Sequence, residues 1–193
     1  FEKVTLPEGN ISVTYKDEKG RVTSTKQIGD NNHLVTTYQY DILSQLKKVT
    51  DADNRETLYE YDNFGQKTSV LHPDNGTSNF SYYLTGQLKS SSNEKLKLQS
   101  EEITYAYNFN QLAEITFPSY VENGQNYPQH TVRYTYGSNA APDYAAGRIT
   151  EITDLTGTKT MKYGMLGEVV EDIRILNSQN TGAVYSTIAW KPS

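Results

Sequence analysis

Short runs in which aromatic and polar residues alternate recur along this chain. The clearest run is Thr57–Leu58–Tyr59–Glu60–Tyr61, which is followed by Asp62–Asn63–Phe64–Gly65. Because successive side chains of a β-strand point to opposite faces, Thr57, Tyr59 and Tyr61 share one face. Asp favours the first position of a tight turn, and Gly accepts the left-handed backbone that closes a bulged hairpin. The segment therefore predicts a β-strand that ends in a hairpin corner.

The same frame repeats along the chain. A Gly-x-apolar signature marks the start of each return strand, as in Gly20–Arg21–Val22, with Ser44 and Asn110 in the Gly position of weaker copies. Counted from seven such corners, the spacings are 24, 21, 21, 24, 37 and 20 residues, so the period is near one hairpin. The predicted repeat-defining structural residues are Tyr38, Tyr40, Tyr59, Tyr61, Asp62, Gly65, Tyr82, Gly86, Tyr105, Tyr107, Tyr134, Tyr136, Tyr163 and Gly167.

These patterns predict an all-β fold. We expect residues 1–193 to form a single array of about seven tandem β-hairpins in one long, curved antiparallel sheet, as a fragment of a larger protein. The interval of 37 residues holds two insertions, near 118–130 and 138–146. The apolar residues of each return strand lie two and five positions after the Gly, on opposite faces unless a β-bulge intervenes. The sequence leaves open a bulge or a sheet that is apolar on both faces.

Composition narrows the class of function. The chain is polar, but its 16 Tyr and 5 Phe are placed regularly, which favours order over disorder. The net charge of −5 and the absence of a basic stripe argue against a nucleic-acid partner. There is no Cys, so disulfides and thiolate metal sites are excluded. No apolar stretch approaches the length of a membrane span, so we expect no membrane insertion by this segment.

Candidate catalytic and metal-ligating residues are scattered. His33, His72 and His130 share no ligand spacing, and His72–Pro73–Asp74 is typical of a turn. Asp51–Ala52–Asp53–Asn54 faintly resembles a calcium loop but lacks its Gly and its distal Glu. No nucleophile elbow, phosphate-binding loop or dinucleotide fingerprint is present. We therefore predict that this chain is not an enzyme and that it has no catalytic residue, metal site or cofactor.

The two insertions are the places where individual recognition would lie, because loops often carry it. Tyr120, Tyr127 and Tyr144 fall there, outside the repeat register, and are weak candidates for contact with a partner. The alternative is that these tyrosines fold back onto the sheet.

The motif Tyr59-x-Tyr61–Asp62-x-x-Gly65, followed by Pro73–Asp74-x-Gly76, resembles the repeat of the RHS/YD-repeat proteins. That family includes bacterial RHS and wall-associated proteins, the B–C components of Tc toxins, and the teneurins. The resemblance runs from about Ile11 to Trp190. It implies hairpins that wind into part of a spiral shell, which in bacterial members encloses a C-terminal toxin polypeptide. About seven repeats are too few to close a shell, and the chain has no Asp–Pro dipeptide of the self-cleaving core segment.

The resemblance implies a non-catalytic structural segment of a secreted or cell-surface bacterial protein. Its partners would be flanking repeats of the same protein and an enclosed C-terminal toxin polypeptide, and raw sheet edges would favour edge-to-edge self-association. One alternative is an aromatic repeat module that binds carbohydrate or cell wall, although such modules use Trp-rich cages and this chain has one Trp. A second alternative is an enzyme on a β-propeller, whose four-stranded blades need a period near 40–45 residues.

Overall fold

The computed structural model describes residues 2–5, 11–29, 33–140, 144–177 and 185–188. Residues 141–143 of the second insertion and Trp190 lie outside the described residues. The chain divides into two compact units, Phe1–Gly86 with Ser91–Leu98 (unit 1) and Gln87–Ser90 with Gln99–Ser193 (unit 2). Each unit is described by itself.

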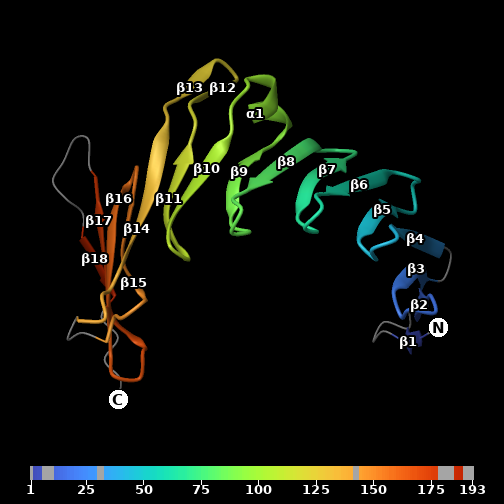
Figure 1. The fold of residues 1–193 in the computed structure, drawn as a ribbon, viewed down its shortest axis with the longest axis horizontal. Helices are drawn as coiled ribbons and strands as arrows, with labels where there is room; N and C mark the ends of the chain where they lie inside the picture. Colours follow the sequence, from blue (N-terminus) through green and yellow to red (C-terminus); the bar gives the residue numbers. More distant parts are fainter. Residues whose placement is uncertain (1, 6–10, 30–32, 141–143, 178–184, 189–193) are drawn as a thin grey trace. The chain divides into compact units, whose positions relative to one another are not determined.

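Unit 1 is an antiparallel meander, in which each strand pairs with the strand before it in the sequence. A short helix lies against the last of these strands (Figure 1). The elements are β1 (Glu2–Thr5), β2 (Ile11–Lys16), β3 (Val22–Ile28), β4 (His33–Tyr40), β5 (Leu46–Thr50), β6 (Glu56–Tyr61), β7 (Lys67–His72), β8 (Gly76–Tyr82) and α1 (Glu94–Leu98).

Unit 2 repeats the same plan, with one hairpin set apart from the main sheet. Its strands are β10 (Ile103–Asn108), β11 (Gln111–Phe117), β14 (His130–Tyr136), β15 (Ile149–Asp154), β16 (Gly157–Tyr163), β17 (Val169–Leu176) and β18 (Tyr185–Ile188), with β12 (Tyr120–Glu122) and β13 (Gln125–Tyr127) in the separate hairpin. β9 (Leu88–Ser92) has residues in both units.

The predicted all-β fold of tandem antiparallel hairpins is therefore confirmed. The strands of each unit pair in chain order. Among the described residues they do not group into separate four-stranded blades, so the propeller alternative is wrong for this part of the chain.

A β-bulge settles the question of the two faces. In unit 1 the register shifts between Gln39 and Tyr40, so that Tyr40 faces Leu46 and Tyr38 faces Val49. The extra residue, Lys47, brings Leu46 and Val49 to the same face despite their odd separation. The shift recurs just before the last residue of β2, β6, β14 and β16, and just before Tyr107, the second-to-last residue of β10. In β5, β11 and β15, both apolar positions of the return strand thus lie on the face that carries the tyrosines.

The first insertion forms a small hairpin of its own. β12 and β13 pair only with each other, and the stacked rings of Tyr120 and Tyr127 lie 4.6 Å apart. At the second insertion Gly137 forms an isolated bridge with Ala146. Ala145 beside it keeps 1% of its surface, so this corner is closed by packing against the backbone.

The sheet buries little. Val13 and Leu96 each keep 8% of their surface, and most strand side chains are half-buried. Stability must then come from the many cross-strand pairs and hydrogen bonds that link neighbouring strands. The one helix in the described part of the chain has five residues, well short of a bilayer span.

Candidate functional site

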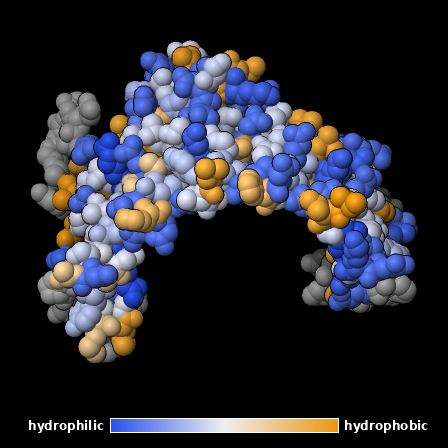
Figure 2. Space-filling model, viewed as in Figure 1, coloured by the Kyte–Doolittle hydropathy of each residue, from blue (hydrophilic) through white to orange (hydrophobic). Residues whose placement is uncertain are grey.

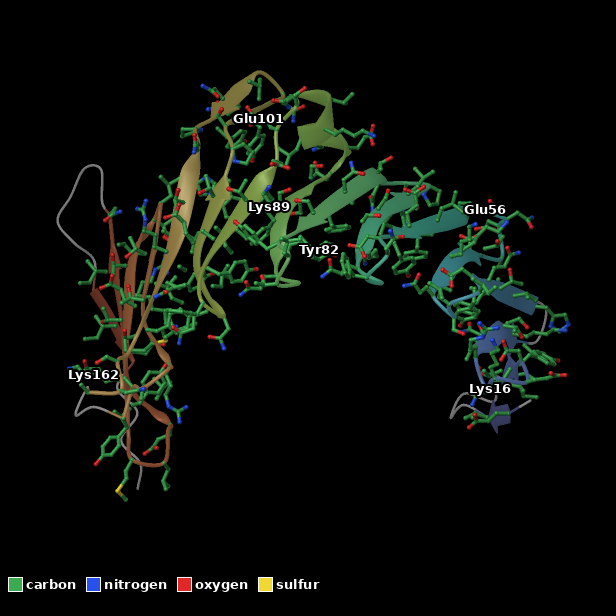
Figure 3. All side chains as sticks on the ribbon, viewed as in Figure 1. Lys16, Glu56, Tyr82, Lys89, Glu101 and Lys162 are labelled. Atoms are coloured by element: carbon green, nitrogen blue, oxygen red, sulfur yellow. The ribbon has the colours of Figure 1, made fainter. Side chains whose placement is uncertain are left out.

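In five of the described hairpins, a tyrosine hydroxyl joins the hairpin to the one before it. In unit 1, the hydroxyl of Tyr40 donates to the carbonyl of Val22 at 2.9 Å, and the hydroxyl of Tyr61 donates to the carbonyl of Leu46 at 2.9 Å. Tyr82 does the same to Lys67 at 2.8 Å, at the corner end of β8 (Figure 3). In unit 2 the pairs are Tyr136 with Leu112 at 3.0 Å and Tyr163 with Ile149 at 2.6 Å.

The carbonyl that accepts this bond belongs to the first residue of a return strand or, in β11, to the second residue, Leu112. The ladder between β5 and β6 ends at Lys48 and Leu58, two residues before the carbonyl of Leu46 is reached. The other four pairs end at the same offset. The hydroxyl therefore satisfies a backbone acceptor beyond the last rung of the ladder, where the bulge has bent the strand away. We call this bond the tyrosine clamp.

Burial keeps the clamp in its donor form. Desolvation, with smaller contributions from Tyr59 and Asp41, raises the pKa of Tyr61 above its ordinary value. Desolvation also raises the pKa of Tyr82, aided by the nearby charge of Asp62. Both hydroxyls therefore stay protonated through the physiological range and can donate.

The first tyrosine of each pair has a different role. Tyr38, Tyr59, Tyr105 and Tyr134 face Val49, Val70, Ile115 and Ile152, respectively. Aromatic rings opposite β-branched residues contribute about 0.2–1 kcal/mol each. Met161 takes this position in β16 and faces Asp172. In β10 the second tyrosine of the pair, Tyr107, faces Leu112.

The hairpin corner is fastened by its Asp. The backbone N–H of Asp62 donates to the carbonyl of Gln66, and that of Gly65 donates to the carbonyl of Asp62. The Oδ1 of Asp62 accepts the N–H groups of Phe64 at 2.8 Å and Gln66 at 2.9 Å. Gly65 has a φ of 80°, a conformation that residues with a Cβ rarely adopt. The corner thus satisfies its own backbone groups.

Successive corners also touch. The polar residue after each corner Gly reaches the next corner: Arg21 donates to Oγ of Ser44 at 3.0 Å, and Gln87 donates to the carbonyl of Phe109 at 2.8 Å. A Cβ placed on Gly65 would lie 2.9 Å from Nε2 of Gln45, and one on Gly86 would lie 3.2 Å from Nε2 of Gln66. Gly167 stands in the same way beside Arg148.

Cations add to the clamp at two of these positions. The guanidinium of Arg21 lies 4.8 Å from the ring centre of Tyr40, and that of Arg148 lies 5.5 Å from the ring centre of Tyr163. Each is close enough for a cation–π contact with the clamping ring. Arg21 therefore contacts both the next corner, through Ser44, and the next clamping tyrosine, Tyr40.

Two sequence details differ from the simple repeat. Asn110 was expected to take the left-handed position of a corner, but the positive φ, 54°, belongs to Phe109. β10 and β11 are joined through Phe109 and Asn110 alone, because Asn108 pairs with Gln111. This two-residue turn has no room for the longer corner. In β2, Lys16 takes the register position of the clamping tyrosine, opposite Val22, so Tyr15 lies out of phase with the repeat.

A connecting turn repeats the corner chemistry without having been predicted to do so. Oδ1 of Asp51 accepts the N–H groups of Asp53 and Arg55, both at 2.9 Å, and Asn54 has a φ of 61°. These are the bonds of the Asp62 corner with Asn in the place of Gly. The spacing Asp51-x-x-Asn54 in the sequence is what indicates this turn, because it places a residue that tolerates positive φ three positions after the Asp.

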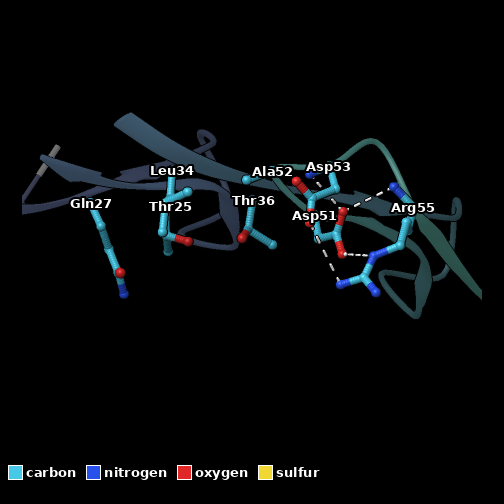
Figure 4. Close-up of a pocket in the computed structure, with 8 residues that line it drawn as sticks. All are labelled: Thr25, Gln27, Leu34, Thr36, Asp51, Ala52, Asp53 and Arg55. Carbon is cyan, nitrogen blue, oxygen red and sulfur yellow. Dashed lines mark hydrogen bonds and ion pairs between the residues drawn. The ribbon is translucent and has the colours of Figure 1, made fainter. Parts of the chain in front are cut away.

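A pocket lies beside this turn in unit 1 (Figure 4). It has a volume of about 270 Å³ and is open to solvent. Its lining residues are Thr25, Gln27, Leu34, Thr36, Asp51, Ala52, Asp53 and Arg55. Nε of Arg55 donates to Oδ2 of Asp51 at 2.8 Å, so the two charged groups are committed to each other. The pocket offers hydroxyls, an amide and the carboxylates of Asp51 and Asp53, both of which lie within ion-pair distance of Arg55.

Hydrogen bonds and neighbouring arginines lower the pKa values of three Asp carboxyl groups in the turns. The backbone N–H of Arg55 lowers the pKa of Asp51, and the side chain of Arg21 lowers that of Asp17. Burial by itself would raise the pKa of Asp154, but hydrogen bonds from Thr156 and Arg174 lower it to about 2.

The histidines and the insertion tyrosines do not gather into a site. Nδ1 of His72 accepts the N–H of Asp74 at 3.2 Å within its turn, and His130 stacks on Phe117 at 4.8 Å. Tyr144 is 54% exposed at the second insertion, away from the stacked pair of Tyr120 and Tyr127. Within the described ranges, no three His, Asp or Glu side chains are grouped as metal ligands would be.

The comparisons with known proteins agree with this geometry. Residues 43–77 match the family model described as RHS Repeat. The chain contains an RHS repeat. The matched segment spans a complete Asp corner, the connecting turn Asp51–Arg55 and the clamping Tyr61. The predicted resemblance to the RHS/YD-repeat proteins is confirmed. No curated protein matches the sequence significantly.

Solved structures share the fold. The chain is similar to a TcdB2-TccC3-Cdc42 structure, with a TM-score of 0.68 and 16% identity over 96% of this chain and 9% of that one. The TcdB2-TccC3 structure gives a TM-score of 0.67 and 16% identity over 96% and 10%. A Photorhabdus luminescens Tc holotoxin pore with a mutated TccC3 gives 0.66 and 15% over 96% and 9%. The chain thus spans about a tenth of the length of these structures.

Proposed function

We propose that this chain is a non-catalytic structural segment of a secreted or cell-surface bacterial RHS-type protein. In that protein its hairpins contribute to a β-shell that encloses or presents a C-terminal toxin polypeptide. The tyrosine clamp carries the proposal, because it recurs at five hairpin junctions with the same geometry and joins hairpin to hairpin. Likeness in fold to the TcdB2-TccC3 structures supports it.

The proposal makes residues 1–193 one array of about seven hairpin units, to which flanking repeats add. β1 and β18 end the order of paired strands. Each is a strand edge to which a neighbouring hairpin can add by the same antiparallel pairing used inside each unit. In the isolated chain, these edges are also where edge-to-edge association would occur.

Protease protection in the parent polypeptide tests the proposal. Tyr40→Ala, Tyr61→Ala and Tyr82→Ala together remove three clamps from unit 1, and Tyr59→Phe is the matched control. We expect the C-terminal polypeptide to resist protease in the parent and in the control, and to be cleaved when the three clamps are lost. Equal digestion of the C-terminal polypeptide in all three proteins would contradict the proposal.

A second measurement separates this function from glycan binding. The exposed stack of Tyr120 and Tyr127 is the feature that favours a carbohydrate module, because sugars pack on aromatic rings. A calorimetric titration with soluble cell-wall glycans should give no saturable heat. Saturable heat that disappears in Tyr127→Ala would assign the insertion hairpin to glycan recognition instead.

A further inference from the structure

The hairpin corners of unit 1 carry large apolar side chains that point into solvent. Ile42 is 93% exposed, Leu43 70%, Phe64 84% and Leu84 104%. All four lie between the first residue of a corner and its left-handed residue, at three successive corners on the same edge of the meander. Figure 2 shows hydrophobic surface at these corners. We call these four residues the apolar corner row.

The corners can be desolvated at little cost. At two of the three corners the Asp carboxylate accepts backbone N–H groups: Oδ1 of Asp41 accepts that of Gln45, and Oδ1 of Asp62 accepts those of Phe64 and Gln66. At the third corner the N–H of Gly86 donates to the carbonyl of Tyr83. Covering the row therefore removes water mainly from apolar atoms and leaves few polar groups without a partner. An exposed apolar row whose polar groups are satisfied internally has the character of an interface.

The charges around the apolar corner row indicate which kind of partner surface can bind it. The tips of the three corners are otherwise Asn63 and Thr85, with no charge, whereas the preceding corner carries Glu18 and Lys19. The connecting turns on the opposite edge of the sheet carry a charged cluster, in which Asp51, Asp53 and Asp74 surround Arg55. Contact between the row and that edge would bury carboxylates against apolar side chains, which is unfavourable. The fitting partner is therefore an uncharged apolar row.

The spacing selects the partner further. Corners recur every two strands, so the apolar side chains stand about 9.5 Å apart along the edge. A second copy of this chain presents the same spacing. With Phe64 on a twofold axis, Phe64 of each copy meets the other, and Leu43 of one copy meets Leu84 of the second. We propose that the apolar corner row is a self-association surface that binds the corner row of a second copy of this chain.

The area is of the right size for a specific contact. Four large side chains at about 150 Å² each, the lower end for aromatic residues, give roughly 600 Å² per copy. A standard interface buries about 800 Å² per partner, which neighbouring polar corner residues would complete as a rim. A twofold contact uses one patch on both copies, so it closes as a dimer rather than a filament.

Sedimentation velocity on the full chain tests the association. The variant carries Leu43→Lys, Phe64→Lys and Leu84→Lys, and the corner fold tolerates this because Lys19 already occupies the place equivalent to Leu43 and Phe64. Leu155→Lys, at a connecting turn where Leu155 is 60% exposed, is the matched control. We expect a concentration-dependent dimer in wild type and control, and at least about tenfold weaker association in the variant. A strict monomer in the wild type, or a variant that associates as the wild type does, overturns the proposal.

Disulfide trapping locates the contact, because the chain has no Cys. Phe64→Cys lies at the proposed axis, and Asn75→Cys lies at a connecting turn on the opposite edge. The first should form a cross-linked dimer under mild oxidation much faster than the second. Equal rates, or faster cross-linking through residue 75, would contradict a corner-to-corner contact. These results are independent of the shell function, which concerns the parent polypeptide and its protection from protease.

Discussion

The hairpin corner Asp62–Gln66 and the connecting turn Asp51–Arg55 are built by the same hydrogen bonds and yet differ in what they present. In both, an Asp carboxylate accepts the N–H groups two and four residues later. The left-handed residue is Gly65 in one and Asn54 in the other. The corner tip is Phe64, whereas the turn tip is Asp53 beside an exposed ion pair of Asp51 with Arg55.

The difference shows that local hydrogen bonds and neighbouring hairpins impose separate requirements. Asn tolerates a positive φ, so the backbone alone does not demand Gly at either place. A Cβ on Gly65 would lie 2.9 Å from Nε2 of Gln45, the end of a flexible side chain. Glycine at the corner is therefore favoured by contact with the preceding repeat as well as by conformation. Four sets of substitutions test these requirements, in decreasing order of expected effect.

Gly157→Ala should have the largest effect. Gly157 has a φ of 154°, and a Cβ there would collide with the backbone carbonyl of Ile175 on the neighbouring strand. Backbone cannot move aside as a side-chain end can, so we expect a loss of about 2–4 kcal/mol in the free energy of unfolding.

Gly20→Ala is the control for that change. Its φ is 79° and no atom lies within 4 Å of the added Cβ. Only the left-handed conformation is penalised, by about 1–2 kcal/mol. Urea unfolding of both variants measures the difference, and equal losses would show that the close approach to Ile175 is unimportant.

Tyr61→Phe removes the clamp while keeping the ring. The carbonyl of Leu46 loses its donor, so the free energy of unfolding should fall by about 1–1.5 kcal/mol. In the described structure the hydroxyl of Tyr59 makes no hydrogen bond, so Tyr59→Phe should cost less than about 0.5 kcal/mol. Thermal unfolding of the pair provides the test. A loss in Tyr59→Phe as large as that in Tyr61→Phe would remove the special role of the clamp.

The free energy of unfolding should depend on pH through the carboxyl group of Asp154. Its pKa is about 2 in the folded chain against an ordinary 3.8. Since the folded pKa is the lower one, the stabilisation is present above pH 3.8 and is lost as the pH falls towards 2. The pair with Arg174 is partly exposed, so the loss should be about 1 kcal/mol. Urea unfolding from pH 5 to pH 2 measures it, and Asp154→Asn should flatten this part of the curve.

Gly65→Asn should have the smallest effect. Asn accepts the left-handed backbone, and the amide of Gln45 is the end of a flexible side chain that can swing away. We expect a loss of about 0.5 kcal/mol or less, against about 1 kcal/mol or more for Gly65→Ala. Chemical unfolding of both variants compares them. A larger loss for Asn than for Ala would show that the position of Gln45 is rigidly held.

Much of the fold could be predicted because its signals are local. The alternation around Tyr59 and the Asp-to-Gly spacing of residues 62–65 are properties of single strands and turns. The partners of the clamp could not be predicted in this way. Tyr61 bonds to Leu46, 15 residues away, and that contact depends on which strands are neighbours and where the bulge lies.

The sequence by itself determined the hairpin period, the strand polarity and the Asp-fastened corners, because each follows from the conformational preferences of a few adjacent residues. The tertiary structure decided the register after each bulge, the choice of Leu46 and Val49 for one face, and the position of Phe109 at a two-residue turn. Those features depend on pairing between strands, where a shift of one residue reverses every side chain, and no single segment contains that information.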